Sequence, residues 1–168
     1  RLDFGRLMRV NILDKRSYRS IRLCEKPGDG NCVDTRDHPD TMLGETQERW
    51  LGEGLAGGST WNVLGLGGLV MPFDRSAQKV PTNGYDNWTG YPDARERLVR
   101  MIADRGLKNV VIAGGDSHMF FIGDLPSRRG DLESPAVASE LHATSISSNS
   151  SNGLPIGPDP RLATNPHM

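Results

Sequence analysis

Asp116 and His118, which follow an apolar run and a pair of glycines, are the residues of this sequence best suited to chemistry. The run 109–113 has the β-branched and small apolar residues of a buried strand, and the glycines allow a sharp turn or close approach by other groups. Side chains two residues apart on an extended backbone point the same way. A carboxylate oxygen and an imidazole nitrogen so placed form half of a typical hydrolytic metal site. The alternative is structural, with Asp116 capping a turn and His118 hydrogen-bonded at a sheet edge.

Four other side chains are candidates for binding a substrate. Arg16 or Arg19, after the first predicted strand, could hold a phosphate group through two hydrogen bonds, or could be the solvated partner of a nearby carboxylate. Trp88 and Tyr91 could form an apolar wall beside a substrate, or could anchor a long loop to the body of the protein. The sequence leaves these alternatives open.

A serine nucleophile is disfavoured. Several serines lie within 144–148, and one of them could in principle pair with His118. The Gly-x-Ser-x-Gly pattern that presents such a serine on a strained turn is absent from the sequence.

Strands and helices are expected to alternate, which places the chain in the α/β class. A strand is predicted at 8–14 with Val10 and Ile12 facing the core, and a long loop is predicted from 65 to 90. Further strands are predicted at 61–64, 109–113, 118–122 and 135–141.

Two helices are predicted between these strands. The first covers about 44–55, and the second begins at Pro92 and stops at Gly106. The apolar face of the second helix is expected to carry Ala94, Leu98, Met101 and Ile102. Its other faces are expected to carry Arg95, Arg97, Arg100 and Asp104.

Composition excludes some classes of protein. With 168 residues, 36% of them hydrophobic, and a net charge of −1, the chain can form a core but has no overall field for nucleic acid or anionic lipid. It has no apolar run long enough to span a membrane and no signal peptide in the part given. Any affinity for phosphate must therefore be local.

Cys24 and Cys32 flank a loop rich in glycine, with a proline. A disulfide across this loop would fit an exported protein and would stabilise the fold by about 2 to 3 kcal/mol in the chain-entropy model. Two free thiols or a pair of metal ligands are the alternatives, although a zinc site is disfavoured without paired histidines.

An ordered series of short segments resembles the PhoD family of alkaline phosphatases, which are calcium- and iron-dependent metallophosphoesterases. No single segment is decisive, but the match of several in the same order is specific. The segments are 13–19, 41–51, 61–64, 86–92, 115–118, 124–125 and 144–148.

The resemblance implies a fold and a domain organisation. The fold would be the four-layer αββα sandwich of calcineurin-like phosphoesterases, of which residues 1–149 would be the C-terminal half, followed by a Pro- and Ser-rich tail at 150–168. The family's first metal-binding motifs lie upstream of the matched region, so the upstream half of the same domain is an expected partner. Export to the periplasm, cell envelope or medium is likewise implied for the whole protein.

The resemblance also implies a reaction and its cofactors. Asp116 and His118 stand where the family has its last metal-binding motif, so both are expected to bind metal, with Ca²⁺ and Fe³⁺ as cofactors and a phosphoester as substrate. Arg16, Trp88 and Tyr91 are the expected substrate-binding residues. The chain alone is expected to bind metal weakly and to hydrolyse phosphoesters poorly.

Some positions depart from the family pattern. Gly65 to Gly68 stand where a glutamine-containing segment is usual, Thr89 replaces a usual aspartate, and Gly123 stands where asparagine is common. Each change removes a polar side chain. The alternative function is therefore an α/β binding or interaction module that kept the fold and lost the chemistry. A nucleotide-binding domain is disfavoured, because only two glycines follow the strand and no helix signal begins after them.

Overall fold

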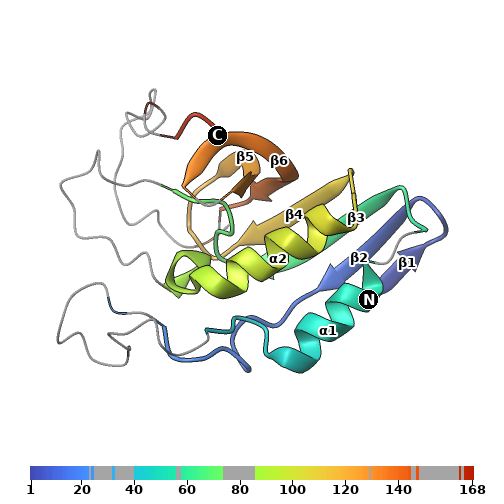
Figure 1. The fold of residues 1–168 in the computed structure, drawn as a ribbon, viewed down its shortest axis with the longest axis horizontal. Coiled ribbons are helices and arrows are strands. Elements are labelled where there is room, and N and C mark those ends of the chain that lie inside the picture. The colour runs from blue at the N-terminus through green and yellow to red at the C-terminus, as the bar shows by residue number, and fades with distance from the viewer. Residues whose placement is uncertain are drawn as a thin grey trace.

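One mixed sheet with two α-helices on one of its faces makes up the fold (Figure 1). The structure is a computed structural model. It describes residues 1–22, 24, 32, 40–55, 58–73, 86–128, 130–144, 147, 163 and 165–168. The predicted α/β class is confirmed.

The sheet has six strands in the order β1-β2-β3-β4-β6-β5. Neighbours from β2 to β6 pair in parallel, while β1 and β5 are antiparallel edge strands. The carboxyl ends of β2, β3 and β4 therefore lie along one edge of the sheet. The strands are β1 Leu2–Phe4, β2 Met8–Ile12, β3 Trp61–Gly67, β4 Val110–Gly115, β5 Phe121–Arg128 and β6 Asp131–His142.

The two helices begin and end close to the predicted positions. Helix α1 spans Glu45–Gly54 and α2 spans Pro92–Asp104. Pro92 occupies the first turn of α2, where its missing N–H costs nothing, and Gly106 ends the helix region with a φ of 60°. The Asp40 carboxylate accepts hydrogen bonds from two backbone N–H groups in the first turn of α2, and burial nevertheless raises the pKa of Asp40.

The prediction that Arg95 of α2 points away from the core is wrong. Arg95 is buried, and its Nε donates a hydrogen bond of 2.7 Å to the Val70 carbonyl oxygen. The segment after β3 passes under this part of the helix, and its buried carbonyl requires a donor. Helical periodicity alone does not reveal such a backbone acceptor.

The predicted core positions of β2 are wrong by one residue. Asn11 and Leu13 are buried, whereas Val10 is half-buried and Ile12 is 61% exposed. Alternation is preserved, but the face that meets the helices is the one carrying Asn11. A one-residue shift moves every side chain of a strand to the opposite face, and the apolar pattern chose the wrong face here.

The reason is that both faces of this sheet are apolar. The covered face lies beneath the helices and includes Leu64 and Ile112, both fully buried. The open face is the opposite one, and strand register places Ile12, Leu141 and Ile122 in one row across it, with Ile122 69% exposed. Leu141 and Ile122 are open to solvent in the described structure, while Ile12 at the end of the row also lines a cavity beside α1.

The segment after β3 differs from the predicted loop at 65–90. Strand β3 continues to Gly67, and Leu69, Val70 and Met71 that follow are almost completely buried. Residues 74–85 lie outside the described residues. The short 3-10 helix η2, Trp88–Gly90, then leads into α2.

The last residues of the chain contact its own body. The backbone N–H of Asp124 donates to the His167 carbonyl oxygen at 2.8 Å, and the His167 side chain lies 2.7 Å from the Pro72 carbonyl oxygen. Residues 165–168, at the end of the predicted Pro- and Ser-rich tail, are therefore held against the body of the protein. Most of the predicted tail, including 148–162, lies outside the described residues.

Candidate active site

The candidate residues gather at the carboxyl edge of the parallel strands. Lys15 and Arg16 follow β2, Gly67 and Gly68 end β3 and start the next segment, and Asp116 follows β4. In open parallel sheets this edge is where ligands bind, because the loops there can differ without disturbing the strands. The topology thus brings together groups about 100 residues apart in the sequence.

Asp116 and His118 lie in a turn beyond the end of β4, and the predicted extended geometry is wrong. Their φ angles are 75° and 54°, which is the left-handed region that side chains other than those of glycine seldom adopt. Such strain collects at functional sites, where the surrounding structure holds it in place. The predicted strand at 118–122 begins at Phe121 for the same reason.

His118 is half-buried, and the described part of the chain offers its ring no side-chain hydrogen bond. Its ring nitrogens retain their capacity to bind a ligand.

Two cations hold the Asp116 carboxylate through the same oxygen. Lys15 Nζ lies 3.0 Å from Asp116 Oδ2, and Arg16 Nη2 lies 3.1 Å from it. The hydrogen bond from Lys15, aided by the charge of Arg16, lowers the pKa of Asp116 against the opposing effect of burial. The Asp116 side chain is 48% exposed, so this carboxylate remains reachable from solvent.

Asp86 extends the ion pairs into the next loop. Arg16 Nη1 contacts both carboxylate oxygens of Asp86, at 3.1 and 2.8 Å, and Arg19 Nη1 lies 2.6 Å from Oδ1. Burial opposes ionisation of Asp86, but hydrogen bonds from Arg19 and Arg16 outweigh it and lower its pKa. The result is an ion-pair ladder, by which we mean Arg19, Asp86, Arg16, Asp116 and Lys15.

Arg16 is thus the partner of two carboxylates, the alternative that the sequence left open for it. Its side chain is half-exposed, and a guanidinium with several donors can exchange a carboxylate for a phosphate. A role in binding phosphate stays a prediction.

Trp88 and Tyr91 are each only 1% exposed and lie in the core. The Tyr91 hydroxyl donates to the Ser20 carbonyl oxygen at 2.9 Å, and burial raises the pKa of Tyr91. Both residues fix the segment that carries Asp86, which agrees with their alternative role as anchors of the loop.

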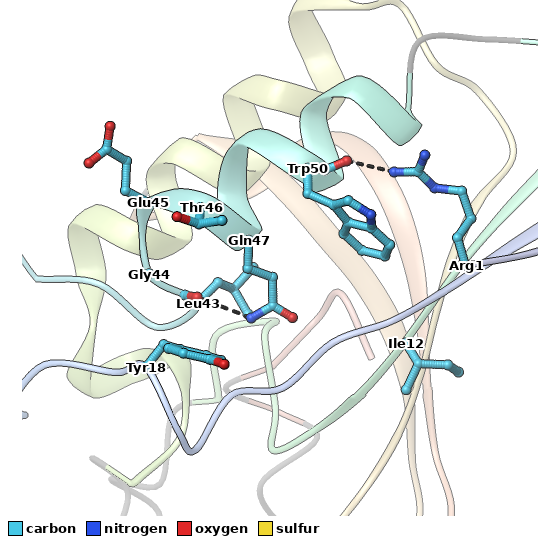
Figure 2. Close-up of a pocket in the computed structure, with 9 residues that line it drawn as sticks. All are labelled: Arg1, Ile12, Tyr18, Leu43, Gly44, Glu45, Thr46, Gln47 and Trp50. Carbon is cyan, nitrogen blue, oxygen red and sulfur yellow. Dashed lines mark hydrogen bonds between the residues drawn. The ribbon is translucent and has the colours of Figure 1, made fainter.

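A separate cavity of about 640 Å³ lies between α1 and the chain after β2 (Figure 2). Tyr18 and Trp50 line it, and the Arg1 guanidinium lies 4.4 Å from the Trp50 ring centre while donating to the Trp50 carbonyl oxygen. None of the predicted site residues lines this cavity. Most of its lining residues fall within the segments 13–19 and 41–51 that resemble the family, but none of them was predicted as a site residue.

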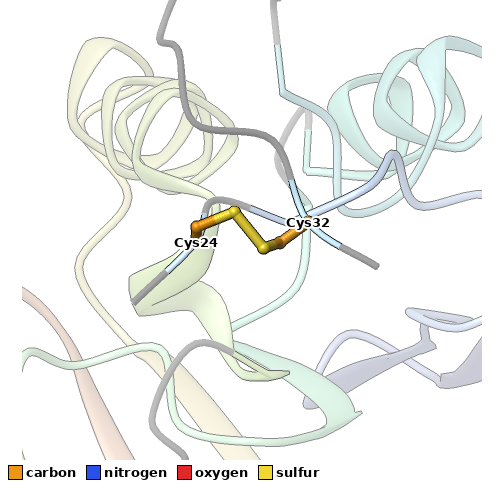
Figure 3. The surroundings of a disulfide bond; sticks show 2 residues. All are labelled: Cys24 and Cys32. Carbon is orange, nitrogen blue, oxygen red and sulfur yellow. A yellow bond between two sulfur atoms is a disulfide. The ribbon is translucent and has the colours of Figure 1, made fainter. Parts of the chain in front are cut away.

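Cys24 and Cys32 are joined by a disulfide (Figure 3). This confirms the pairing that the sequence left open and excludes the free thiols and the metal pair. The loop between the cysteines, residues 25–31, lies outside the described residues. Among the described residues, no helix is long and apolar enough to cross a membrane.

Comparison with known proteins identifies the family. The family model of PhoD-like phosphatases matches residues 1–164. Alkaline phosphatase D of Bacillus subtilis (strain 168) is 34% identical over 172 residues, which cover 98% of this chain and 29% of that protein. The chain belongs to the PhoD-like phosphatase family.

A solved structure of PhoD shares this fold. It superposes with a TM-score of 0.78 and 31% sequence identity, covering 99% of this chain and 32% of that one. The fold is therefore that of an α/β phosphoesterase, as the resemblance implied. The chain spans about a third of the length of these relatives.

The candidate site suits a metal ion in the chemistry of its donors. Asp116 offers a carboxylate oxygen and His118 an imidazole nitrogen. However, the described residues contain no cluster of three or more His, Cys, Asp or Glu side chains able to hold a metal. The donor atoms of Asp116 and His118 are of the types that bind metal ions, but the described residues supply too few donors to complete a metal site.

Two features of the structure, one at the site and one in the fold beside it, were missed from the sequence. One is Lys15, which stands directly after a predicted strand and beside a predicted phosphate ligand. The other is the buried pair formed by Glu140 and His142 on β6, with His142 Nε2 2.7 Å from Glu140 Oε1. The signal for this pair was present, because an acid and a histidine two residues apart within a strand must share a face.

Proposed function

We propose that this chain carries part of the catalytic site of a metal-dependent phosphoester hydrolase that acts on phosphomonoesters or phosphodiesters. Membership of the PhoD-like phosphatase family supports a phosphoesterase. The observation that carries the assignment to particular residues is the left-handed turn that places Asp116 at the carboxyl edge of the parallel strands, paired with the two cationic side chains Lys15 and Arg16.

In this proposal Asp116 and His118 are two ligands of the metal centre, with Ca²⁺ and Fe³⁺ as its ions. A bound metal ion supplies a water or hydroxide nucleophile near neutral pH and neutralises charge on the phosphoryl group. The remaining ligands come from outside the described residues. Asp116 contributes an oxygen, and His118 contributes a neutral ring nitrogen.

Arg16 serves as the phosphate ligand in this proposal. Its guanidinium lies between Asp86 and Asp116 and can turn donors toward a phosphoryl oxygen while one carboxylate keeps it in place. Trp88 and Tyr91 contribute only indirectly, by fixing the loop that bears Asp86.

We further propose that the open face is the inner layer of the four-layer sandwich, covered in the active enzyme by the sheet that supplies the remaining metal ligands. The exposed row of Ile12, Leu141 and Ile122 supports this, because isolated apolar sheet faces of this kind are rare on soluble proteins. The chain alone then has little activity. Export of the whole protein is proposed from the family resemblance and the disulfide.

The second candidate is the binding module that kept the fold and lost the chemistry. One observation favours it, namely that Asp116 Oδ2 is already paired with Lys15 and Arg16. The module would retain the ladder and bind no metal.

The test is hydrolysis of an aryl phosphomonoester and an aryl phosphodiester by the gene product extended upstream of Arg1, with and without chelator. We expect turnover that chelator abolishes, and at least about 100-fold less turnover in His118→Ala, which removes a metal ligand. Absence of turnover from a folded, metal-supplemented protein would favour the binding module. Strong turnover by the 168-residue chain that survives chelation would contradict the metal assignment.

A further inference from the structure

Lys15 is a buried cation at the candidate site. Only 6% of the residue is exposed, whereas Arg16 beside it is half-exposed. Lysine is seldom buried unless it is paired, because removing its charge from water is costly. Its Nζ makes that pair with Asp116 Oδ2 at 3.0 Å.

The backbone at the end of β3 is shaped to admit this side chain. A Cβ atom at Gly67 would lie 2.9 Å from Lys15 Cε, and one at Gly68 would lie 2.6 Å from Lys15 Nζ. Gly68 also has a φ of 68°, which disfavours other residues there. Two glycines therefore leave room for one ammonium group, and the Lys15 position is built into the fold.

The Lys15 ammonium group and a metal ion would compete for the Asp116 carboxylate. Two cationic donors lie within 3.1 Å of Asp116 Oδ2, and both bond to this oxygen rather than to Oδ1. A cation binding to this carboxylate would meet the charge of Lys15 a few ångströms away in a partly desolvated setting, where repulsion is weakly screened. Lys15 must therefore oppose metal binding at Asp116.

We propose that Lys15 is a positioning residue for Asp116: it holds the Oδ2 atom and leaves Oδ1 free to bind a metal ion. The positive charge of Lys15 also weakens the affinity of the site for cations. This inference rests on the proposed function in taking Asp116 as a metal ligand. The inference goes beyond the proposed function because it assigns Lys15 a role in setting the metal affinity of the site.

The test is Mn²⁺ binding to the 168-residue chain, measured by the electron paramagnetic resonance signal of free Mn²⁺. Lys15→Met keeps the length of the apolar stem and removes the charge, and Lys15→Gln is the second variant if the first folds poorly. Lys108→Met is the matched control, since Lys108 is exposed and lies away from Asp116. Circular dichroism establishes that each variant is folded.

We expect Lys15→Met to bind Mn²⁺ at least about tenfold more tightly than the wild-type chain, because a repelling charge is removed. Lys108→Met should change the affinity by less than about twofold, since an exposed distant charge is screened. Adding Asp116→Asn to Lys15→Met should abolish the gain. A merely structural lysine would leave Mn²⁺ affinity unchanged or lower it when replaced.

Equal or weaker Mn²⁺ binding by both Lys15 variants, including no measurable binding, would overturn the inference. A gain that persists with Asp116→Asn would do the same. No substrate is present in these measurements, so their failure is distinguishable from failure of the proposed function, which rests on chelator-sensitive hydrolysis and His118→Ala.

Discussion

Two acid and histidine pairs with the same spacing have opposite surroundings, one lying on β6 and the other just beyond the end of the neighbouring strand β4. Strand β6 stays extended through Glu140 and His142, so both side chains point to the covered face and hydrogen-bond to each other. After β4 the backbone turns left-handed at Asp116 and His118, which places the Asp116 carboxylate half-exposed at the sheet edge. The extended backbone predicted for Asp116 and His118 is found instead at Glu140 and His142.

The difference teaches that spacing alone does not make a site. Glu140 also accepts hydrogen bonds from the backbone N–H groups of Val70 and Met71, so its oxygens are engaged within the protein. Asp116 pairs instead with side chains at the sheet edge, where solvent or a ligand can also reach its carboxylate. The contacts of the buried pair are those of a structural element, and the proposed function gives the chemistry to Asp116 and His118.

The largest effect should come from Glu140→Ala. It would leave two buried backbone N–H groups and His142 without their acceptor, at a cost of about 3 kcal/mol in the free energy of unfolding. Glu133→Ala, an exposed glutamate on the same strand, is the matched control and should change stability by less than about 0.5 kcal/mol. Urea unfolding of both variants measures this. Equal stability of the two variants would show that the buried pair does not support the fold.

Adjacent glycines sharpen the comparison. A Cβ at Gly114 would lie 2.3 Å from His142 Nε2, whereas one at Gly115 would have only the Ala143 carbonyl oxygen nearby, at 3.7 Å. We expect Gly114→Ala to destabilise the fold by about 2 kcal/mol through displacement of His142, and Gly115→Ala by less than about 1 kcal/mol. Thermal unfolding monitored by circular dichroism compares them. The structural role of the buried pair is contradicted if Gly115→Ala proves the more damaging.

Self-association should depend on the open face. The isolated chain exposes Ile122 and its neighbours in the row, so we expect it to form oligomers at micromolar concentration. Ile122→Lys should weaken this association by at least about 1 kcal/mol, because a charged side chain replaces an apolar one at the interface. Sedimentation velocity across a range of concentrations gives the result. A wild-type chain that remains a monodisperse monomer would contradict the exposed face as an interaction surface.

The smallest effect should be the pH dependence contributed by Asp86. Its pKa is lowered in the folded chain, so its contribution is present above the unfolded pKa, near 4, and is lost as pH falls through the folded value. Because Asp86 is half-exposed, Asp86→Asn should cost less than about 1 kcal/mol at pH 7, and the difference from wild type should vanish once the pH is below the lowered folded pKa of Asp86. Urea unfolding across this range tests the sign. A difference that grows toward low pH would be inconsistent with the ion pairs to Arg16 and Arg19.

Much of the fold was predictable because local signals were strong. Pro92 and Gly106 bracket α2 as expected, and the apolar run before Gly114 forms β4. The face of β2 was not predictable from one strand, since both faces of the sheet carry apolar residues and only the packed helices reveal which one they cover.

The sequence indicated which residue types surround the candidate site at Asp116, but it did not indicate their geometry. The types and order of residues around Asp116 pointed to the family, but no local pattern reports a left-handed φ at a residue other than glycine. The pairing of Asp116 with Lys15 joins residues far apart in the sequence. It becomes visible only when parallel register aligns the ends of β2 and β4.

The most direct test of the central claim compares His118→Ala with His142→Ala in the gene product extended upstream of Arg1, measuring both hydrolysis of an aryl phosphomonoester and the free energy of unfolding. We predict that His118→Ala loses at least about 100-fold in turnover with stability within about 1 kcal/mol of wild type. His142→Ala should instead lose about 2 kcal/mol of stability and keep turnover within about tenfold while folded. A folded, metal-loaded His118→Ala enzyme with turnover close to that of wild type would contradict the assignment of the exposed pair to chemistry.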